Sequence, residues 1–231
     1  VFLPADQLHK ISRYFGAASP DGVNLSKLGG KAWENLKSRA RKAAHELAGE
    51  LINLYAERRR AIGFAFSPDN EMQLQFEDSF PFNETRDQLD AIDKVKEGME
   101  AAQPMDILIC GDVGFGKTEV ALRAAFKAVQ DSKQVMILAP TTILTQQHFG
   151  TFSERMRDFP VTVDFVSRFR TKAQQKETLQ RFEQGEVDIL IGTHRLLSAD
   201  VRPKDLGLIV VDEEQRFGVK QKELLRQLRL R

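Results

Sequence analysis

The sequence predicts an α/β fold in which a parallel β-sheet carries helices on both faces, preceded by a long helix and a short N-terminal module. From about residue 82 onward, apolar runs of strand length alternate with amphipathic segments of helix length. Such alternation is typical of parallel sheets, whose strands are buried on both faces. A glycine-rich turn joins the first apolar run to the helical segment after it. Upstream, apolar residues recur at three- and four-residue steps from Trp33 to Tyr55, which indicates one long helix.

Breakers of regular structure divide the first part of the chain into three segments. Residues 1–30 contain the turn-forming stretches SPDG and LGG and form the short module. Residues 31–66 form a connecting segment whose helix ends at Gly63, and about thirty helical residues give a rod of roughly 45 Å. Residues 67–82 are expected to be a linker, because a Pro-Asp-Asn turn interrupts them. The larger domain therefore spans residues 83–231.

Strands and helices are expected to alternate through the larger domain. We expect strands at 105–110, 134–139, 161–166, 187–191 and 207–211. We expect helices at 85–99, 117–130, 143–157, 172–184 and 218–228. The spacing of the apolar residues is the basis of each assignment. No internal repeat or low-complexity tract interrupts the order.

Composition places the chain among globular proteins. It has 231 residues, 42% of them hydrophobic, and a net charge of +1, with the N-terminal segments net basic and the larger domain net acidic. Cys110 is the only cysteine, so no internal disulfide can form, and the four histidines lack metal-ligand spacing. No apolar run approaches the ~18 residues of a membrane span, and no signal peptide is present. These features favour a cytoplasmic protein with no membrane partner. The opening VFLPADQL, without Met, suggests the interior of a longer chain.

The stretch Gly111–Thr118 reads GDVGFGKT and matches the phosphate-binding loop pattern GxxxxGK[ST]. Its glycines let successive backbone N–H groups point at one anion, which the positive end of the following helix also attracts. We expect Lys117 to reach the terminal phosphates of ATP and the Thr118 hydroxyl to hold Mg²⁺. An ordinary glycine-rich turn is the alternative. The residues predicted to contact the nucleotide here are Gly111, Asp112, Val113, Gly114, Phe115, Gly116, Lys117 and Thr118.

An acidic motif supplies the carboxylates that a phosphate loop lacks. Asp212 and Glu213 directly follow the apolar run 207–211, and the carboxyl ends of parallel strands face the ligand crevice. We expect Asp212 to hold Mg²⁺ through water and Glu213 to polarise the water that attacks the γ-phosphate. Together with Lys117 they form the predicted catalytic set. A solvated acidic loop after a strand is the alternative.

The acidic motif and the segments before it resemble those of superfamily 2 helicases and translocases. The stretches LAPTTILTQQHF, VSRFR and GTHRLL follow successive predicted strands, and the resemblance implies that they contact the DNA backbone. Their hydroxyl and cationic side chains suit phosphates. A helix cap or a surface charge is the alternative for each segment taken alone. The residues expected to contact DNA are Thr141, Thr142, Arg168, Arg170, Thr193 and Arg195.

The segment FPFNETRDQLDAI resembles the adenine-recognition segment of the same superfamily. The resemblance implies that Gln88 pairs with the adenine edge and that Phe82 packs against the adenine ring. Thr85 followed by Gln88 also matches the pattern of an N-terminal capping box. Both interpretations hold together, because a capping box fixes the direction in which the Gln88 side chain points.

Several longer blocks narrow the resemblance to the bacterial transcription-repair coupling factors. These blocks are ISRYFGA, KLGGKAWENLK, LYAERRRAIGFAF, GDVGFGKTEVALRAAFKAV and DEEQRFGVKQKE. The resemblance implies that 1–30 is the tail of a domain that binds RNA polymerase, that 31–66 is a relay helix, and that 83–231 is the first RecA-like motor lobe. It implies an ATP-driven translocase on double-stranded DNA. Such a protein displaces stalled RNA polymerase, which it contacts through the β subunit, and recruits nucleotide excision repair proteins through regions absent here.

The sequence departs from this family where it stops, shortly after the acidic motif. The Ser/Thr-Ala-Thr strand, the second motor lobe and its arginine finger are missing. In the family that strand lies between the phosphate-loop strand and the acidic-motif strand. We therefore expect either a gap between 105–110 and 207–211 or direct pairing of the two segments. The chain alone is expected to be an inactive fragment of the motor.

Three other functions fit parts of the sequence. RecG-type branched-DNA helicases share the motor motifs, although not the pattern of residues 3–66. An RNA polymerase-binding module would use the basic N-terminal helix, and the lobe would have no motor activity of its own. A nucleotide switch that binds no DNA would leave the segments at the strand ends unexplained.

Overall fold

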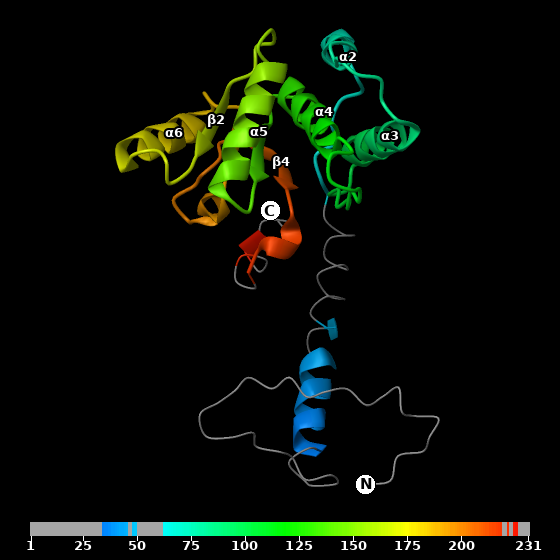
Figure 1. Ribbon diagram of the computed structural model, residues 1–231, viewed down its shortest axis with the longest axis vertical. Coiled ribbons are helices and arrows are strands. Elements are labelled where there is room, and N and C mark those ends of the chain that lie inside the picture. Colours follow the sequence, from blue (N-terminus) through cyan, green and yellow to red (C-terminus); the bar gives the residue numbers. More distant parts are fainter. Residues whose placement is uncertain (1–33, 46–47, 50–61, 219–220, 222–223, 226–231) are drawn as a thin grey trace. The chain divides into compact units, whose positions relative to one another are not determined.

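The computed structural model in Figure 1 describes the following residues: 34–45, 48–49, 62–218, 221 and 224–225. The chain divides into two compact units, Val1–Tyr55 and Ala56–Arg231. The described residues of the first unit are helical and exposed, as the apolar periodicity predicts for this stretch. The expected module at 1–30 lies outside the described residues, as does the part of the expected helix at 50–61.

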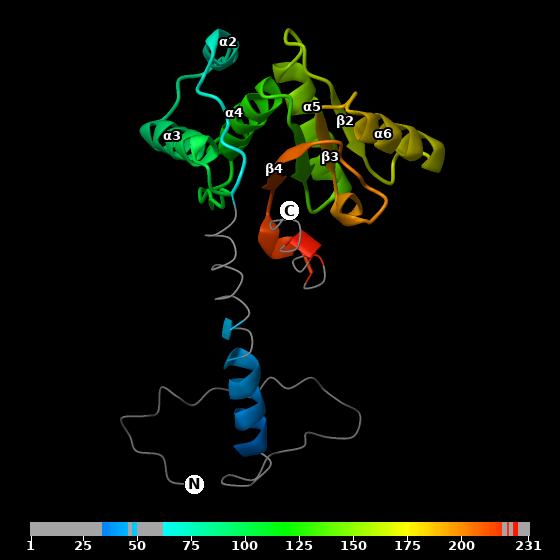
Figure 2. The same ribbon diagram turned by 180° about the vertical axis from the view of Figure 1, so that it is seen from behind.

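The second unit is built on a four-stranded parallel sheet with the order β2-β3-β1-β4 (Figure 2). Leu138 at the end of β1 is in register with Gly192 on β3 and with Val211 on β4. The carboxyl ends of these strands therefore meet at one edge of the sheet. Each strand overlaps a predicted strand. The strands are β1 (Gln134–Leu138), β2 (Val163–Val166), β3 (Ile189–Gly192) and β4 (Leu206–Val211).

Four helices lie within two residues of their predicted bounds. Threonine side chains cap three of them, because Thr85, Thr141 and Thr171 each accept a backbone N–H from the first helical turn. The expected helix at 218–228 falls largely outside the described residues. The four helices are α3 (Arg86–Glu100), α4 (Lys117–Gln130), α5 (Thr142–Arg155) and α6 (Lys172–Gln184).

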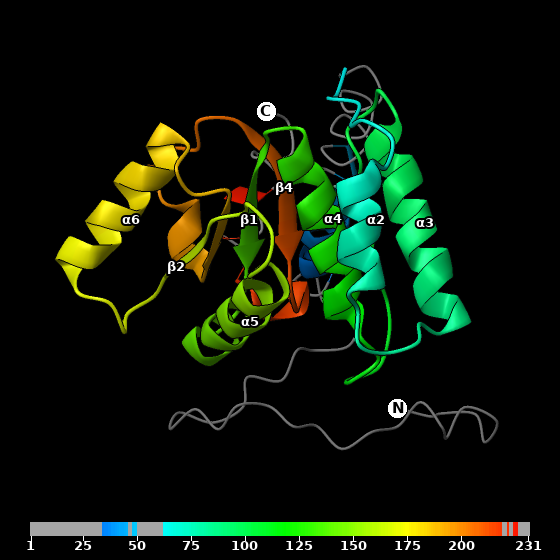
Figure 3. The ribbon, with the colours of Figure 1, turned by 90° about the horizontal axis from the view of Figure 1, so that it is seen from above.

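Helices cover both faces of the sheet (Figure 3). Side chains of β1 alternate between two hydrophobic cores, with Val135 and Ile137 in one and Met136 and Leu138 in the other. The first core includes residues of α3, α4 and α5, and the second includes residues of α6 and of the 3-10 helix η2 (His194–Leu197). A strand with a core on each side has no polar face, which explains the continuous apolar run.

Residues 67–82 belong to the lobe instead of forming the expected linker. A helix, α2 (Glu71–Asp78), lies in this segment. Its Phe76 is fully buried and stacks on Phe126 of α4 with the ring centroids 4.2 Å apart. The turn residues of the segment predict a linker. The burial of the Phe76 ring against α4 instead makes the segment part of the lobe.

Residues 62–66, the end of the expected connecting segment, are not helical. The Gly63 N–H donates to the carbonyl of Ala102 at 3.1 Å, and the Phe66 N–H donates to that of Met99 at 3.0 Å. Phe66 itself is buried in the core. These backbone groups are hydrogen-bonded at the end of α3, so this stretch belongs to the lobe.

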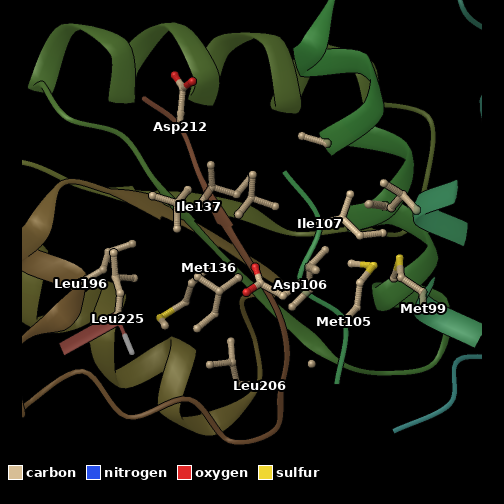
Figure 4. Close-up of a pocket in the computed structure, with 18 of the residues that line it drawn as sticks. Met99, Met105, Asp106, Ile107, Met136, Ile137, Leu196, Leu206, Asp212 and Leu225 are labelled. Carbon is tan, nitrogen blue, oxygen red and sulfur yellow. The ribbon is translucent and has the colours of Figure 1, made fainter. Parts of the chain in front are cut away.

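Residues 105–110 form no strand, contrary to the prediction. They pair with no strand among the described residues, and β4 is the edge of the sheet on this side. An open cavity of about 1900 Å³ lies there, lined by Met105 and Ile107 of this segment and by Met136 and Ile137 of β1 (Figure 4). The structure thus has a gap, the first of the two expected arrangements. An apolar run becomes a strand only where a neighbouring strand pairs with its backbone groups.

Three charged side chains at four-residue intervals on α4 are buried: Glu119, Arg123 and Lys127. The Nε of Arg123 donates to Glu119 at 3.0 Å, and the same guanidinium pairs with Glu84. Burial acts to lower the pKa of Arg123, but the hydrogen bonds to Glu84 and Glu119 outweigh burial and raise the pKa. Buried charges persist in proteins only when they are paired. The cluster therefore specifies which acidic residues lie against α4.

Lys127 ties the same helix to the segment around α2 and α3. Its ammonium donates to the Ser67 carbonyl at 2.8 Å, and to Asp69 and Glu100 at 2.7 Å each. Asp69 also accepts from Lys96 at 2.6 Å. Burial acts to raise the pKa of Asp69, but the hydrogen bonds from Lys127 and Lys96 outweigh burial and lower the pKa. Paired charges thus hold this segment on α4, in addition to aromatic packing.

Replacement of Arg123 by alanine is expected to lower the free energy of unfolding by about 3–5 kcal/mol. The change takes the cationic partner from Glu84 and one of two from Glu119. Urea denaturation followed by circular dichroism measures the difference. Arg157→Ala removes an exposed arginine and is the matched control, expected to stay within about 0.5 kcal/mol of wild type. Equal stability of the two variants would show that the buried ion pairs do not hold α4.

Candidate nucleotide and DNA site

The phosphate-loop segment has the curled backbone that its glycines predict. Gly114 has a φ of 85° and Gly116 a φ of 73°, both in the left-handed region that disfavours a side chain. Gly116 is the N-cap of α4, so the helix begins at Lys117, directly after the loop. The N–H groups in the first turn of a helix have no intrahelical partner. Here the first turn of α4 directly follows the glycine-rich loop, which is the order of elements that phosphate sites use.

The Lys117 side chain folds back over the loop. Its ammonium donates to the carbonyls of Gly111 and Asp112, the latter at 2.8 Å. A Cβ on Gly114 would meet no atom within 4 Å, so the space beside the loop is open. The loop backbone, the N-terminus of α4 and the Lys117 ammonium lie next to one another in this segment. That donor set fits a polyphosphate such as that of ATP.

Asp212 lies directly after β4, close to the loop. Its N–H donates to the carbonyl of Leu138 at 2.8 Å, and its carboxylate accepts from Nε2 of His148 at 2.8 Å. This hydrogen bond lowers the pKa of Asp212, burial opposes the shift, and the charges of His148 and Lys117 add to it. The Lys117 charge acts on Asp212 and both residues line the same cavity, as the prediction of a shared site requires.

The protein ligands predicted for Mg²⁺ are few. Thr118 is the second residue of α4 and is half-buried, and Asp212 is the one carboxylate predicted to join it. Within the described residues, no group of three His, Cys, Asp or Glu side chains could hold a metal ion. One hydroxyl and one carboxylate fit a Mg²⁺ ion that is bound mainly by phosphates and water.

The backbone at Glu213 is strained. Its φ of 53° and ψ of 49° lie in the left-handed region, which is uncommon for residues other than glycine. The carboxylate accepts a hydrogen bond from Gln215 and lies 3.9 Å from Nε of Arg216. Such strain concentrates at functional sites. The proposed role of Glu213 as the residue that polarises water stays a prediction.

Gln88 contacts the phosphate loop. Its side-chain carbonyl accepts from the Thr85 N–H at 2.8 Å, which with the reciprocal bond forms the predicted capping box. Its Nε2 donates to the carbonyl of Phe115 at 3.0 Å. A Cβ on Gly116 would lie 2.2 Å from that nitrogen, so glycine permits the close approach. Phe82 is 72% exposed and lies edge-on to Phe80, with the ring centroids 5.6 Å apart. Adenine recognition by Gln88 and Phe82 stays a prediction.

The hydroxyls predicted to contact DNA lie at the ends of two neighbouring strands, β1 and β3. Thr141 caps α5, since its hydroxyl accepts the Leu144 N–H at 3.2 Å, and Thr142 is the first residue of that helix. Thr193 caps η2 by accepting the Arg195 N–H at 3.5 Å. The structure thus brings the hydroxyls to one edge of the sheet. It also gives Thr141 and Thr193 the capping role that was the alternative.

The arginines predicted to contact DNA differ in their surroundings. Arg168 is exposed. Arg170 pairs with Asp164 at 2.6 Å, and Arg195 pairs with both carboxylate oxygens of Asp200, one of them at 2.7 Å. Arg170 and Arg195 can therefore bind a phosphate fully only in exchange for these carboxylates.

Sequence reasoning missed three side chains that bind predicted site residues: His148, Asp164 and Asp200. The two aspartates were not singled out because nothing in their spacing from an arginine marks an ion pair. His148 carries a usable signal, because it lies seven residues after Thr141 and so on the same face of the helix. Its partner Asp212 is 64 residues away, a distance across which no local pattern operates.

A parallel sheet with a phosphate loop and an Asp-Glu pair at its carboxyl edge defines the nucleotide-binding lobe of a P-loop ATPase. The chain belongs to the DEAD/DEAH box helicase family, whose family model matches residues 85–231. Its lobe has the RecA-like fold that the sequence predicts. Across the described part of the chain, no helix is both long and apolar enough to cross a bilayer.

Curated relatives named "Transcription-repair-coupling factor" are similar to almost the whole chain. The Mycobacterium bovis protein is 56% identical over 229 residues, which is 99% of this chain and 18% of the relative. The Bacillus subtilis protein is 51% identical over 229 residues, which is 99% of this chain and 19% of the relative. The chain thus spans about a fifth of the length of the curated relatives it matches.

Two solved structures share the fold. The structure of RecG bound to a three-way DNA junction has a TM-score of 0.67 and 31% identity, and the match covers 72% of this chain and 23% of that chain. A hypothetical ATP-dependent RNA helicase from Sulfolobus tokodaii has a TM-score of 0.50 and 20% identity, and the match covers 64% of this chain and 42% of that one. The second likeness shows the fold alone.

Replacement of Gln88 by alanine is expected to weaken ADP binding and to abolish the preference for ADP over GDP, because the adenine edge loses its partner. Titration calorimetry with both nucleotides measures the change. Gln88→Glu keeps the acceptor for the capping box and removes the donor to Phe115, so it separates helix capping from the other two roles. Equal weakening of ADP and GDP would show that Gln88 acts only by supporting the loop.

Proposed function

We propose that this chain is part of an ATP-driven translocase on double-stranded DNA, and that its lobe is the first motor lobe. The protein would displace stalled RNA polymerase and couple transcription to nucleotide excision repair. One observation carries this proposal. The phosphate loop and Asp212 lie at the same edge of the sheet as the hydroxyls that are predicted to contact DNA. The name shared by relatives 51–56% identical over 99% of the chain supports the coupling-factor assignment.

Each predicted catalytic residue has a distinct task in ATP hydrolysis. The loop N–H groups and Lys117 bind and orient the phosphates through charge-assisted hydrogen bonds. Thr118 and Asp212 would hold Mg²⁺, which when bound neutralises charge that develops on the transferred phosphoryl group. Glu213 orients the attacking water and accepts its proton.

DNA binding is assigned to the edge formed by the ends of β1, β2 and β3. Hydroxyls at Thr141, Thr142 and Thr193 and the exposed guanidinium of Arg168 supply donors for phosphate oxygens. Contacts of this kind position DNA without reading its sequence, as a translocase requires. RNA polymerase, through its β subunit, is the proposed partner of the N-terminal segments. Repair proteins would bind regions outside this chain.

A branched-DNA helicase is the second candidate, because the RecG structure is similar over 72% of the chain. The coupling-factor relatives match 99% of the chain and so also account for residues that the RecG match leaves out. Preference for forked over linear duplex DNA, measured on the protein that contains this lobe, would favour the RecG-type function.

Replacement of Lys117 by alanine is expected to weaken ADP binding by about 1.5–3 kcal/mol, because it removes a charge-assisted contact to phosphate. Titration calorimetry in the presence of Mg²⁺ measures the affinity. Lys94→Ala, which removes an exposed lysine of α3, is the matched control and should bind like wild type. Equal affinity of wild type and Lys117→Ala would refute the assignment of the phosphate site.

This chain alone is expected to hydrolyse ATP at a negligible rate, without stimulation by DNA. An arginine finger contributes about 10³–10⁵ in rate, and the family resemblance places that residue in a second lobe. Arg216 lies on the same lobe, 3.9 Å from Glu213, so it does not report closure of two lobes. Phosphate release is measured with and without duplex DNA. DNA-stimulated release that disappears in Glu213→Gln would contradict the prediction.

A further inference from the structure

One hydrogen bond joins α5 to the end of β4. Nε2 of His148 and Oδ2 of Asp212 are 2.8 Å apart, and the two side chains are 14% and 29% exposed. The distance is that of a well-formed hydrogen bond to a carboxylate, in which the imidazole N–H donates. His148 lies in the middle of α5, whereas Asp212 directly follows β4. The bond therefore connects two elements that are far apart in the sequence.

The imidazole also contacts the hydrophobic core. Its ring lies edge-on to Phe152 with the centroids 6.5 Å apart, and Phe152 is buried in the first core. Near its C-terminus α5 is also anchored to α4, because Arg155 donates to Glu119 at 2.9 Å. Glu119 directly follows Thr118, the predicted Mg²⁺ ligand. Through these two contacts α5 is bonded to Asp212 and to the residue that follows Thr118.

The hydrogen bond decides how the Asp212 carboxylate is turned. An aspartate χ2 has a broad energy minimum, so the plane of the carboxylate is set by its partners. His148 bonds Oδ2, which leaves Oδ1 pointing in a defined direction. Partners of metal-ligating carboxylates typically change metal affinity 10–100-fold when they are removed.

We propose that His148 is a positioning residue that orients the Asp212 carboxylate for the Mg²⁺-bound nucleotide. The inference rests on the proposed function, since it takes Asp212 as a Mg²⁺ ligand. The inference also makes α5 the element that connects the proposed nucleotide site to the proposed DNA site. The N-cap of α5 is Thr141, a proposed DNA contact, so a shift of this helix on DNA reaches the carboxylate through one hydrogen bond.

The test measures how much Mg²⁺ strengthens ADP binding. A fluorescent ADP analogue is titrated into the full chain, once with Mg²⁺ and once with EDTA, and the ratio of the two Kd values is the readout. His148→Ala is expected to reduce this ratio about 10-fold or more, with the affinity in EDTA unchanged. His148→Gln, whose amide can donate from the place of Nε2, should restore most of the ratio. Gln147→Ala, at an exposed neighbour on α5, should leave the ratio as in wild type.

Each other outcome overturns the inference in a distinct way. An unchanged ratio in His148→Ala would show that Asp212 needs no orienting partner. Equal losses of affinity with and without Mg²⁺ would show that His148 has a merely structural role. A wild-type protein that binds ADP but gains nothing from Mg²⁺ would overturn the Asp212 assignment and this inference together. Thermal unfolding verifies that each variant is folded, and His148→Gln gives a second substitution should the alanine variant unfold.

Discussion

Paired charges buried along α4 fix the position of the helix that begins at the phosphate loop. Arg123 and Lys127 pair with acidic residues of the segment that precedes the loop, and Glu119 pairs with Arg123. Separating such charges in a protein interior is costly, because each would remain desolvated without its partner. The segment must therefore stay seated on α4, and α3 with it. The contact of Gln88 with the loop depends on this arrangement, since Gln88 projects from the first turn of α3.

The same cluster reaches the side of the lobe assigned to DNA. Glu119 accepts from Arg123 on its own helix and from Arg155 on α5, so one buried carboxylate joins the two helices. His148 adds a second connection, from α5 to Asp212. Nucleotide and DNA would thus bind to elements that share ion pairs and a hydrogen bond. Coupling between two binding sites is reciprocal by thermodynamic necessity, so nucleotide should alter DNA affinity as much as DNA alters nucleotide affinity.

Local patterns were sufficient for the features that depend on neighbours in the sequence. Continuous apolar runs located β1 to β4, and the Thr85 capping box located the start of α3. The parallel topology then placed Asp212 beside the loop. Features that depend on distant parts of the chain were missed. α2 packs through the stacking of Phe76 on Phe126, and residues 105–110 pair with none of the strands in the described part of the chain. Asp164 and Asp200 lie only six and five residues from the arginines they pair with, and they were missed because neither spacing marks an ion pair.

The strain at Glu213 has a physical reason if Asp212 and Glu213 have their two predicted roles. Consecutive side chains of an extended strand point to opposite faces, so Asp212 and Glu213 could not both act on one nucleotide if β4 simply continued. The left-handed turn at Glu213 ends this alternation, at a cost of about 1–3 kcal/mol. Surrounding contacts must hold such a conformation. Asp212 is fixed by its bonds to Leu138 and His148, and the Glu213 carboxylate is held by Gln215. The predicted metal ligand and the predicted water-orienting group are thus kept adjacent, because the chain is anchored on both sides of one strained residue.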